Sequence, residues 1–308
     1  MPYTRALKYH FPLMYGEDVL ELQLQLKKRG YVITGQADGI FGSMTESAVR
    51  AFQASHNLKV DGVAGPQTWT ALFQDKERKA GIDKVLGFLP DLKRPHAYRD
   101  SVKWYLDHTG VIIETGPPET FGGEPKTVRR VWNDFRPAIE EWAQEFGVPV
   151  ELIIATISTE TRGDPAAVRK EPGYISDEHT PDKVSPGLMQ TLISTARDVL
   201  GDDSIDRKWL LAPQNSIRAG TALIAQQWKV THLDPPKVAC AYNAGSLYYN
   251  NSKENRWKMR QYPVNTSEHA DRFVKWFNEC FIMFEKDGTT TAPSFFTLFN
   301  RIAGDEKV

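Results

Sequence analysis

Glu160 ends an apolar run, residues 150–161, whose spacing predicts a helix. On such a helix Glu160 lies on the same face as Ile153 and Ile157, the face expected to pack against a core. A carboxyl group in that position loses hydration, which raises its pKa and suits it to donate a proton near neutral pH. Taken alone, the residue also fits a solvated glutamate at a frayed helix end.

Two short segments further along the chain help to decide whether Glu160 is a buried proton donor or a solvated helix end. Residues 187–190 read Gly-Leu-Met-Gln, and residues 241–245 read Ala-Tyr-Asn-Ala-Gly. The second segment also fits an ordinary helix C-terminus ending at Gly245, with Tyr242 packed in a core. Only the ordered combination with Glu160 is specific enough to predict an enzyme.

In this order, Glu160 and these segments resemble the catalytic domain of the soluble lytic transglycosylases, which are relatives of goose-type lysozyme and cut the glycan strands of peptidoglycan. Residues 211–220 resemble the helix that precedes the Tyr-Asn-Ala-Gly segment in that family. The resemblance implies a lysozyme-like α-helical domain. It also implies an enzyme, a lytic transglycosylase or muramidase, that cleaves the β-1,4 bond between MurNAc and GlcNAc.

The resemblance further implies a mechanism with one carboxylate. Hydrolases usually place a second carboxylate across the scissile bond, but Glu160 has no acidic partner at a fixed spacing. In the family, one glutamate donates a proton to the leaving oxygen and then accepts one from the 6-hydroxyl of the muramyl sugar, which closes a 1,6-anhydro ring. Such an intramolecular nucleophile has a high effective concentration. Glu160 would play both roles.

The positions that match the family's motifs give the remaining candidates for the site. Gly187 is expected to let the backbone approach the sugar, and Met189 and Gln190 to line the cleft. Tyr242 and Asn243 are expected to orient the acid. The substrate contacts predicted in this way are Thr161, Gly187, Leu188, Met189, Gln190, Tyr242, Asn243 and Ala244.

The sequence departs from the family pattern in ways that affect the product. Thr161 stands where the family usually has serine, and Phe273 replaces a late tyrosine. Residues 169–179 form an apparent insertion that is expected to lie over the cleft. Its acidic residues could position a water, so the sequence leaves open whether the product is an anhydro sugar or a hydrolysed one.

The N-terminal part contains one pattern twice, at residues 38–45 and 61–69. In each copy Asp-Gly sets a tight turn and a helix follows. An earlier helix is predicted over residues 17–29, ending at Gly30.

This pattern resembles the small three-helix peptidoglycan-binding domain, and the residues that carry the resemblance are Leu22, Gln23, Gly30, Tyr31, Asp38, Gly39, Phe41, Gly42, Phe52, Gln53, Thr68 and Trp69. It implies wall binding through a groove near the repeated turns. The predicted contacts are Asp38, Gly39, Phe41, Gly42, Asp61, Gly62, Thr68 and Trp69. The alternative for each residue alone is that it only shapes the fold.

The chain of 308 residues is predicted to be mainly α, with a wall-binding domain over residues 1–75 and a catalytic domain over residues 131–308. Residues 76–130 are predicted to form a semi-ordered connector with a short helix, followed by an N-terminal extension of the catalytic domain. The helices predicted in the catalytic domain cover residues 138–146, 149–160, 194–200, 217–230, 234–245 and 269–283, the fifth capped by Asp234.

Composition excludes several classes of function. The net charge of −1 gives no electrostatic reason to expect a nucleic-acid partner. No apolar run is long enough for a secretory signal or a membrane span. Neither His-Glu-x-x-His nor Cys-x-x-Cys occurs, so no metal and no cofactor are expected. The sequence leaves open whether Cys240 and Cys280 pair.

Peptidoglycan is therefore the expected partner of a chain expected to act as a monomer. A wall enzyme without a signal sequence points to a phage endolysin, held in the host cytoplasm until lysis. Two alternatives remain. One is a virion-associated lysin, and the other is a wall-binding or tail protein that kept the fold and lost the chemistry.

The C-terminal segment has two interpretations. Phe295, Leu298, Phe299 and Ile302 would form one stripe on a helix. The stripe either docks on the catalytic domain or approaches an outer membrane. Docking is favoured, because only Arg301 is positive there and a membrane-active helix usually has a basic face.

Overall fold

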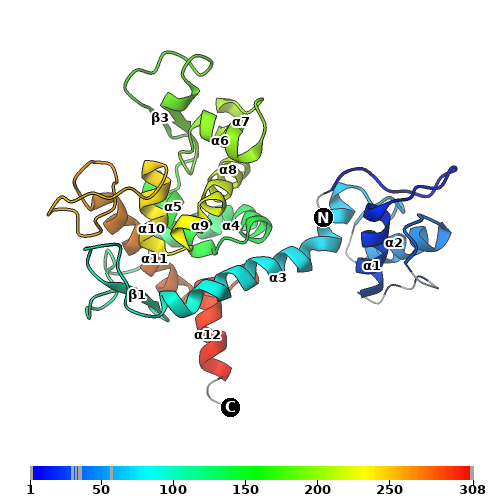
Figure 1. Ribbon diagram of the computed structural model, residues 1–308, viewed down its shortest axis with the longest axis horizontal. Coiled ribbons are helices and arrows are strands. Elements are labelled where there is room, and N and C mark those ends of the chain that lie inside the picture. Colours follow the sequence, from blue (N-terminus) through cyan, green and yellow to red (C-terminus); the bar gives the residue numbers. More distant parts are fainter. Residues whose placement is uncertain (1–2, 29–30, 32, 34–36, 56–57, 306–308) are drawn as a thin grey trace. The chain divides into compact units, whose positions relative to one another are not determined.

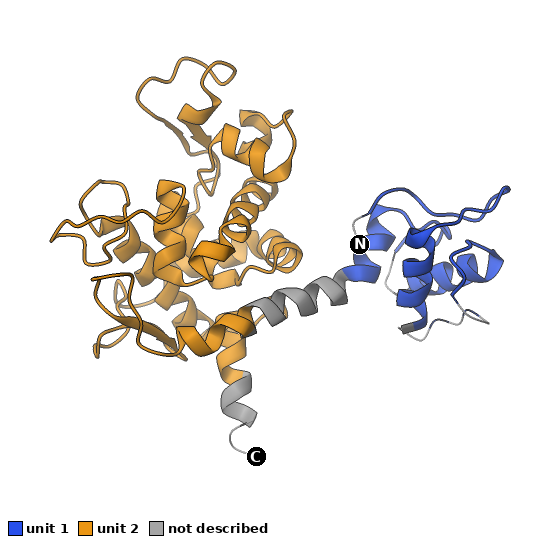
Figure 2. Ribbon diagram, in the orientation of Figure 1, with its two compact units in different colours: residues 1–77 blue, residues 78–308 orange. Residues whose placement is uncertain are grey.

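The computed structural model describes residues 3–28, 31, 33, 37–55 and 58–305 (Figure 1). It divides the chain into two compact units, Met1–Glu77 (unit 1) and Arg78–Val308 (unit 2), shown in Figure 2. Each unit has its own hydrophobic core. Helices dominate the described residues and the strands are short, so the prediction of a mainly α fold is confirmed.

Unit 1 is built on α1 (Glu17–Lys28), α2 (Ser43–Ser55) and the start of α3 (Pro66–Leu92). Their apolar faces meet in a core that includes Leu22 and Phe52, both 0% exposed. The predicted helix end at Gly30 lies outside the described residues.

The first Asp-Gly turn is held by the amide of Gln23 from α1. Its Nε2 donates to Asp38 Oδ1 at 2.9 Å and to Thr45 Oγ1 at 3.0 Å. Its Oε1 accepts from the backbone N–H of Gly39 at 2.8 Å. Gly39 has a φ of +73°, the left-handed conformation that favours glycine.

The second turn repeats this arrangement around Gln53 of α2. Its Nε2 donates to Asp61 Oδ1 and Thr68 Oγ1, both at 3.0 Å, and its Oε1 accepts from Gly62 N at 2.9 Å. The repeat seen in the sequence is therefore a structural repeat, in which the shared Gln, Asp, Gly and Thr residues hold each other.

Helix α3 differs from the prediction of a broken connector with a separate short helix. It runs without interruption from Pro66 to Leu92, through Gly81 and Pro90. A glycine lowers helix stability by only about 1 kcal/mol, which the buried side chains near the end of α3 offset. These side chains, Val85, Leu89 and Leu92, lie in the core of unit 2.

Unit 2 is organised around α5 (Val150–Glu160), whose residues from Val150 to Thr159 are all buried. It packs mainly against α4 (Lys126–Phe146) and α11 (Glu268–Asp287). Around them lie, in chain order, α6 (Ile193–Leu200), α7 (Arg207–Leu211), α8 (Pro213–Gln226), α9 (Trp228–Thr231), α10 (Pro235–Ala244) and α12 (Phe295–Asp305).

The strands form hairpins too short for an alternating sequence pattern. Antiparallel β1 (Trp104–Asp107) and β2 (Gly110–Ile113) pair Trp104 with Ile113. Antiparallel β3 (Val168–Lys170) and β4 (Val184–Pro186) flank the 3₁₀ turn Pro181–Lys183. The green segment with β3, α6 and α7 lies at one end of unit 2 (Figure 1) and has a small core of its own.

Some predicted helix boundaries were wrong. Helix α4 begins well before residue 138 and passes through Pro137, because Val128, Val131 and Trp132 extend its buried face. The helix predicted over residues 217–230 is divided into α8 and α9 at Gln227.

Asp234 precedes α10 as predicted, but its side chain does not cap that helix. It accepts hydrogen bonds from Trp104 Nε1 at 2.8 Å and His96 Nε2 at 2.9 Å, and Lys237 Nζ lies at 3.0 Å. Because it is 1% exposed, these partners replace its hydration, and they hold its pKa below the usual range.

In the described part of the chain, no helix combines the length and apolarity needed to cross a membrane. Cys240 and Cys280 are buried free thiols. Burial raises the pKa of both, so they remain protonated and unreactive.

The first part of helix α12 packs into the core of unit 2, as the favoured interpretation of the C-terminal stripe expects for Phe295, Leu298 and Phe299. Phe295, Leu298 and Phe299 are 0%, 5% and 6% exposed and belong to the core. The side chains of Arg301 and Ile302 lie outside the described residues.

A buried carboxylate of α5 holds the start of α12. Glu151 accepts hydrogen bonds from the hydroxyl of Ser294 and from the backbone N–H groups of Phe295 at 3.1 Å and Phe296 at 3.0 Å. Without this acceptor, the first turn of α12 would have unpaired donors.

We expect Glu151→Ala to lower the free energy of unfolding by at least about 2 kcal/mol, because it leaves buried donors unpaired. Chemical denaturation followed by circular dichroism measures this value. The exposed residue Glu145 gives the control Glu145→Ala, for which a change within about 0.5 kcal/mol is expected. Equal stability of the two variants would show that Glu151 does not hold α12.

Candidate active site

Glu160 is the last residue of α5, and its side chain is 15% exposed. Loss of hydration raises its pKa to about 7, while the positive charges of Arg272 and Arg169 oppose the shift. A substantial fraction of the carboxyl groups is then protonated at neutral pH. Such a group can both donate and accept a proton.

Two hydroxyl groups tie residues 187–190 to this helix end. Thr161 Oγ1 donates to the carbonyl oxygen of Leu188 at 2.8 Å. Tyr242 Oη donates to the carbonyl oxygen of Met189 at 2.8 Å and lies 3.0 Å from Thr191 Oγ1. The predicted segments, distant in sequence, therefore meet beside Glu160.

Gly187 permits a close approach within the chain itself. Its φ is +83°, and a Cβ at this position would lie 2.1 Å from the carbonyl oxygen of Leu210. Its backbone N–H donates to the oxygen of Ala167 at 2.8 Å. The glycine thus places the following residues against α7, which is a different role from the predicted approach to a sugar.

The structure also corrects the roles assigned to the next residues. Leu188 and Met189 are 0% exposed core residues, so their side chains cannot line a cleft. The amide of Gln190 donates to the oxygens of Gly187 at 2.8 Å and Ala167 at 3.2 Å. These side chains hold the segment in place. The carbonyl oxygens of Leu188 and Met189 accept the hydrogen bonds from the hydroxyl groups of Thr161 and Tyr242.

Asn243 fixes the proton position on a buried histidine. Its Oδ1 accepts from the backbone N–H of Tyr262 at 2.6 Å, so its Nδ2 faces His269 Nδ1, at 3.4 Å. Because an amide nitrogen only donates, His269 Nδ1 must accept. The hydrogen of the neutral ring is therefore on Nε2.

His269 Nε2 lies 3.7 Å from Glu160 Oε1. The histidine side chain is 4% exposed, and burial lowers its pKa to about 3, with Arg272 and Arg169 adding to the effect. His269 is therefore neutral, and its Nε2–H faces the acid. The separation exceeds an ordinary hydrogen bond, and such contacts often shorten when substrate binds.

No motif in the sequence marks this histidine as functional. It stands one helical turn before Phe273, which is 1% exposed in the core, and it fits the same buried stripe of α11. Tyr242 and Asn243 belong to a sequence motif, whereas His269 becomes informative only through its neighbours in space.

The insertion at residues 169–179 contains Arg169, whose positive charge acts on Glu160. Its Asp177 is bound by Arg207, with Nε at 2.9 Å from Oδ2, and by the hydroxyl of Tyr174 at 2.8 Å. Of the charged residues in the insertion, Arg169 is the one that acts on the pKa of Glu160. Asp177 is thus paired with Arg207 of α7 and with Tyr174 of the insertion.

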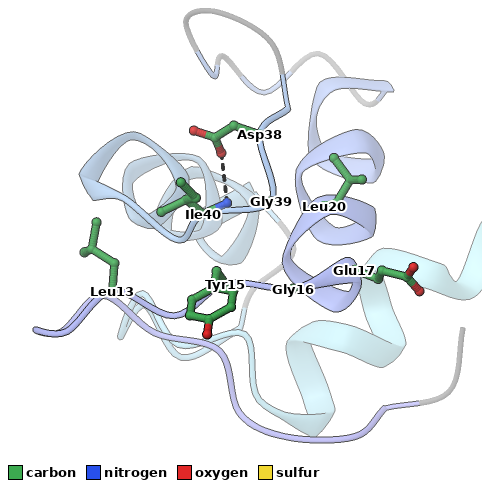
Figure 3. A pocket seen from close by; sticks show the side chains of 8 residues that line it. All are labelled: Leu13, Tyr15, Gly16, Glu17, Leu20, Asp38, Gly39 and Ile40. Atoms are coloured by element: carbon green, nitrogen blue, oxygen red, sulfur yellow. Dashed lines mark hydrogen bonds between the residues drawn. The ribbon is translucent and has the colours of Figure 1, made fainter.

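Of the predicted wall-binding residues of unit 1, some are buried, Asp38 and Gly39 line a pocket, and Gly42 and Asp61 are partly exposed outside it. Phe41, Thr68 and Trp69 are at most 5% exposed, so they serve the fold and are not free to contact a ligand. The second turn does not border the pocket shown in Figure 3. That cavity of about 580 Å³ is lined by Leu13, Tyr15, Gly16, Glu17, Leu20, Asp38, Gly39 and Ile40.

Two family models match the chain. Residues 15–72 match a peptidoglycan binding domain, and residues 137–265 match the transglycosylase SLT domain. The second range contains Glu160, Gly187 and Tyr242. Both resemblances drawn from the sequence are confirmed.

Curated relatives share short stretches with the chain. An N-acetylmuramoyl-L-alanine amidase of Mycobacterium tuberculosis is 38% identical over 79 residues, which are 25% of this chain and 19% of the relative. A spore cortex-lytic enzyme of Bacillus cereus is 53% identical over 53 residues, 17% of this chain and 20% of the relative. The chain thus spans about a fifth of the length of these relatives.

Solved structures with detectable similarity include a Burkholderia AP3 phage endolysin, with 16% identity and a TM-score of 0.21 over 91% of this chain and 100% of that one. They also include the lytic transglycosylase Slt of Pseudomonas aeruginosa, with 13% identity and a TM-score of 0.36 over 89% of this chain and 52% of that one. The family assignment depends on the two sequence models, and by these the chain joins a peptidoglycan binding domain to a transglycosylase SLT domain.

Proposed function

We propose that this chain cleaves the β-1,4 bond between MurNAc and GlcNAc in peptidoglycan, with Glu160 as the general acid. The observation that carries the proposal is the state of this carboxyl group. It has a pKa of about 7 in an SLT domain, at the point where the other predicted segments meet. A proton donor at neutral pH is what cleavage of a glycosidic bond requires.

The proposed reaction uses Glu160 twice. It first gives its proton to the glycosidic oxygen, and the bond from that oxygen to C1 of the muramyl sugar breaks. The 6-hydroxyl oxygen then bonds to C1 and its proton passes to the Glu160 carboxylate, which restores the acid. No water is consumed, and the product carries a 1,6-anhydro ring.

The surroundings of Glu160 support this one-carboxylate route. Arg272 and Arg169 are the charged neighbours that act on its pKa. They stabilise the carboxylate formed by proton donation, as does the Nε2–H of His269. A pKa of about 7 lets the same group act as acid and as base.

The other site residues position this machinery in the proposal. Thr161 and Tyr242 hold the carbonyls of Leu188 and Met189 beside the acid, and Asn243 sets the proton on His269. Gln190 and Ala244 are only partly buried and remain candidates for direct substrate contact.

Mass spectrometry of the products from purified peptidoglycan tests the proposed function. We expect 1,6-anhydro-muramyl ends. Reducing muramyl ends would instead indicate a hydrolytic muramidase with the same acid. Intact glycan would contradict both, and would favour a wall-binding or virion structural protein. The expectation that the enzyme acts in phage-induced lysis stays a prediction.

We expect unit 1, produced as residues 1–77, to bind purified sacculi without cutting them. The unit has its own core and matches a peptidoglycan binding domain. The tether concentrates unit 2 at an insoluble substrate, so unit 2 alone is expected to cut more slowly. Co-sedimentation with sacculi measures binding, and a unit 1 that stays in the supernatant would refute this role.

A further inference from the structure

The two turns of unit 1 are alike in their hydrogen bonds, but different residues cover them. The position three residues before the anchoring glutamine is Leu20 in the first copy and Arg50 in the second. Seven residues before it stand Gly16 and Glu46, respectively. These are the residues that lie over the turn glycine in each copy.

At the second turn, a charged pair occupies the space over Gly62. Arg50 Nη2 lies 2.8 Å from Glu46 Oε1, and Arg50 Nη1 donates to the oxygen of Val60 at 3.2 Å. A Cβ built on Gly62 would lie 2.8 Å from Arg50 Nε and 2.9 Å from Glu46 Cγ. The second turn is therefore closed.

At the first turn no charged side chain covers the glycine, and the nearest atom to a Cβ built on Gly39 is the backbone oxygen of Gly16 at 3.3 Å. Gly16 has no side chain there, and Leu20 Cβ lies 3.6 Å from a Cβ built on Gly39. The result is the cavity of about 580 Å³ in Figure 3. The residues at these two positions, Gly16 and Leu20 in the first copy and Glu46 and Arg50 in the second, thus decide whether a charged pair covers the turn.

The lining of the cavity indicates the chemistry of its ligand. Leu13, Leu20 and Ile40 supply apolar surface, and the ring of Tyr15 is 75% exposed beside them. Asp38 is ionised, because hydrogen bonds from Gln23 and the Ile40 N–H lower its pKa.

Both of these hydrogen bonds go to Asp38 Oδ1. Among the described residues, Oδ2 of Asp38 has no hydrogen-bond donor and can accept one from a ligand. An exposed aromatic ring, an apolar floor and a free acceptor together suit a neutral ring with an apolar face and hydroxyl or amide donors.

We propose that the pocket bounded by Tyr15, Leu20 and Asp38 is the glycan subsite of unit 1 and binds an N-acetylated amino sugar. The inference rests on the proposed wall-binding function of unit 1. The sugar face stacks on Tyr15, the acetyl methyl enters the apolar floor, and a hydroxyl or amide N–H donates to Asp38. The carboxylates of a stem peptide would instead be repelled by Asp38 and Glu17.

The test uses the full chain with Glu160→Gln, so that sacculi are bound without being cut. Leu20→Arg gives the first turn the residue that helps close the second, and Tyr15→Ala removes the exposed ring. We expect each to weaken co-sedimentation with sacculi by at least about tenfold. Leu24→Arg, on an exposed position of the same helix, is the matched control and should change binding less than about twofold.

A second measurement identifies the ligand. A soluble tetramer of N-acetylglucosamine should compete with sacculi for the parent protein and lose this effect in Tyr15→Ala. A free stem tripeptide should not compete. Competition by the tripeptide alone, or unchanged binding in folded Leu20→Arg and Tyr15→Ala, would overturn the subsite. If the parent protein does not sediment with sacculi at all, the wall-binding function itself fails.

Discussion

Glu160→Gln is expected to abolish cleavage of peptidoglycan while the fold and wall binding remain intact. Glutamine keeps the shape of the side chain but cannot donate a proton to the glycosidic oxygen. General acid catalysis typically contributes ~10²–10⁴-fold to a rate. Because Glu160 is the proposed sole acid, the loss should reach the top of that range. Release of soluble muropeptides from sacculi measures the rate.

The insertion provides a control for this substitution. Glu178 carries an exposed carboxyl group among the acidic residues that could position a water. Glu178→Gln should leave the rate within about twofold of the parent, as for most surface substitutions. Equal losses in the two variants would point to a second carboxylate and a hydrolytic mechanism. A folded Glu160→Gln protein with near-parental activity would refute the assignment of the acid.

Helix periodicity predicted the position of Glu160 but not the environment that makes it useful. The apolar spacing of residues 150–160 is enough to place the acid at the end of a buried helix. The cations that oppose its pKa shift are Arg169 of β3, which follows across a loop, and Arg272 of α11, which is distant in sequence. No local pattern records such a contact, so the pKa depends on tertiary packing.

The motif residues near Gly187 show a second limit of sequence-based prediction. Their resemblance to a family identified the right segment, but residue type alone could not separate scaffold from substrate contact. Leu188 and Met189 are buried in the core, whereas their carbonyl oxygens face Thr161 and Tyr242. A motif can therefore be specific for a site through its backbone, with side chains that only support it.

His269→Asn and His269→Gln are expected to distinguish the two contacts of the buried histidine, one from Nδ1 to Asn243 and one from Nε2 to Glu160. An asparagine amide reaches the level of Nδ1, so it keeps the contact with Asn243 and loses the donor toward Glu160. A glutamine amide reaches the level of Nε2 and can still donate to the acid. We expect His269→Asn to lower the maximal rate about tenfold or more and His269→Gln to retain much of it.

The pH profile shows whether the histidine acts through Glu160. The acid must be protonated to donate, so the parental rate falls as pH rises through about 7. Loss of an N–H that stabilises the carboxylate raises the pKa of Glu160 further, so the alkaline limb of His269→Asn should move to higher pH. In His269→Gln it should stay near the parental position. The exposed His108 gives the control His108→Asn, with an unchanged profile. If both His269 variants lose activity but keep the parental limb, the histidine supports only the packing of α11, and its proposed action on the acid is wrong.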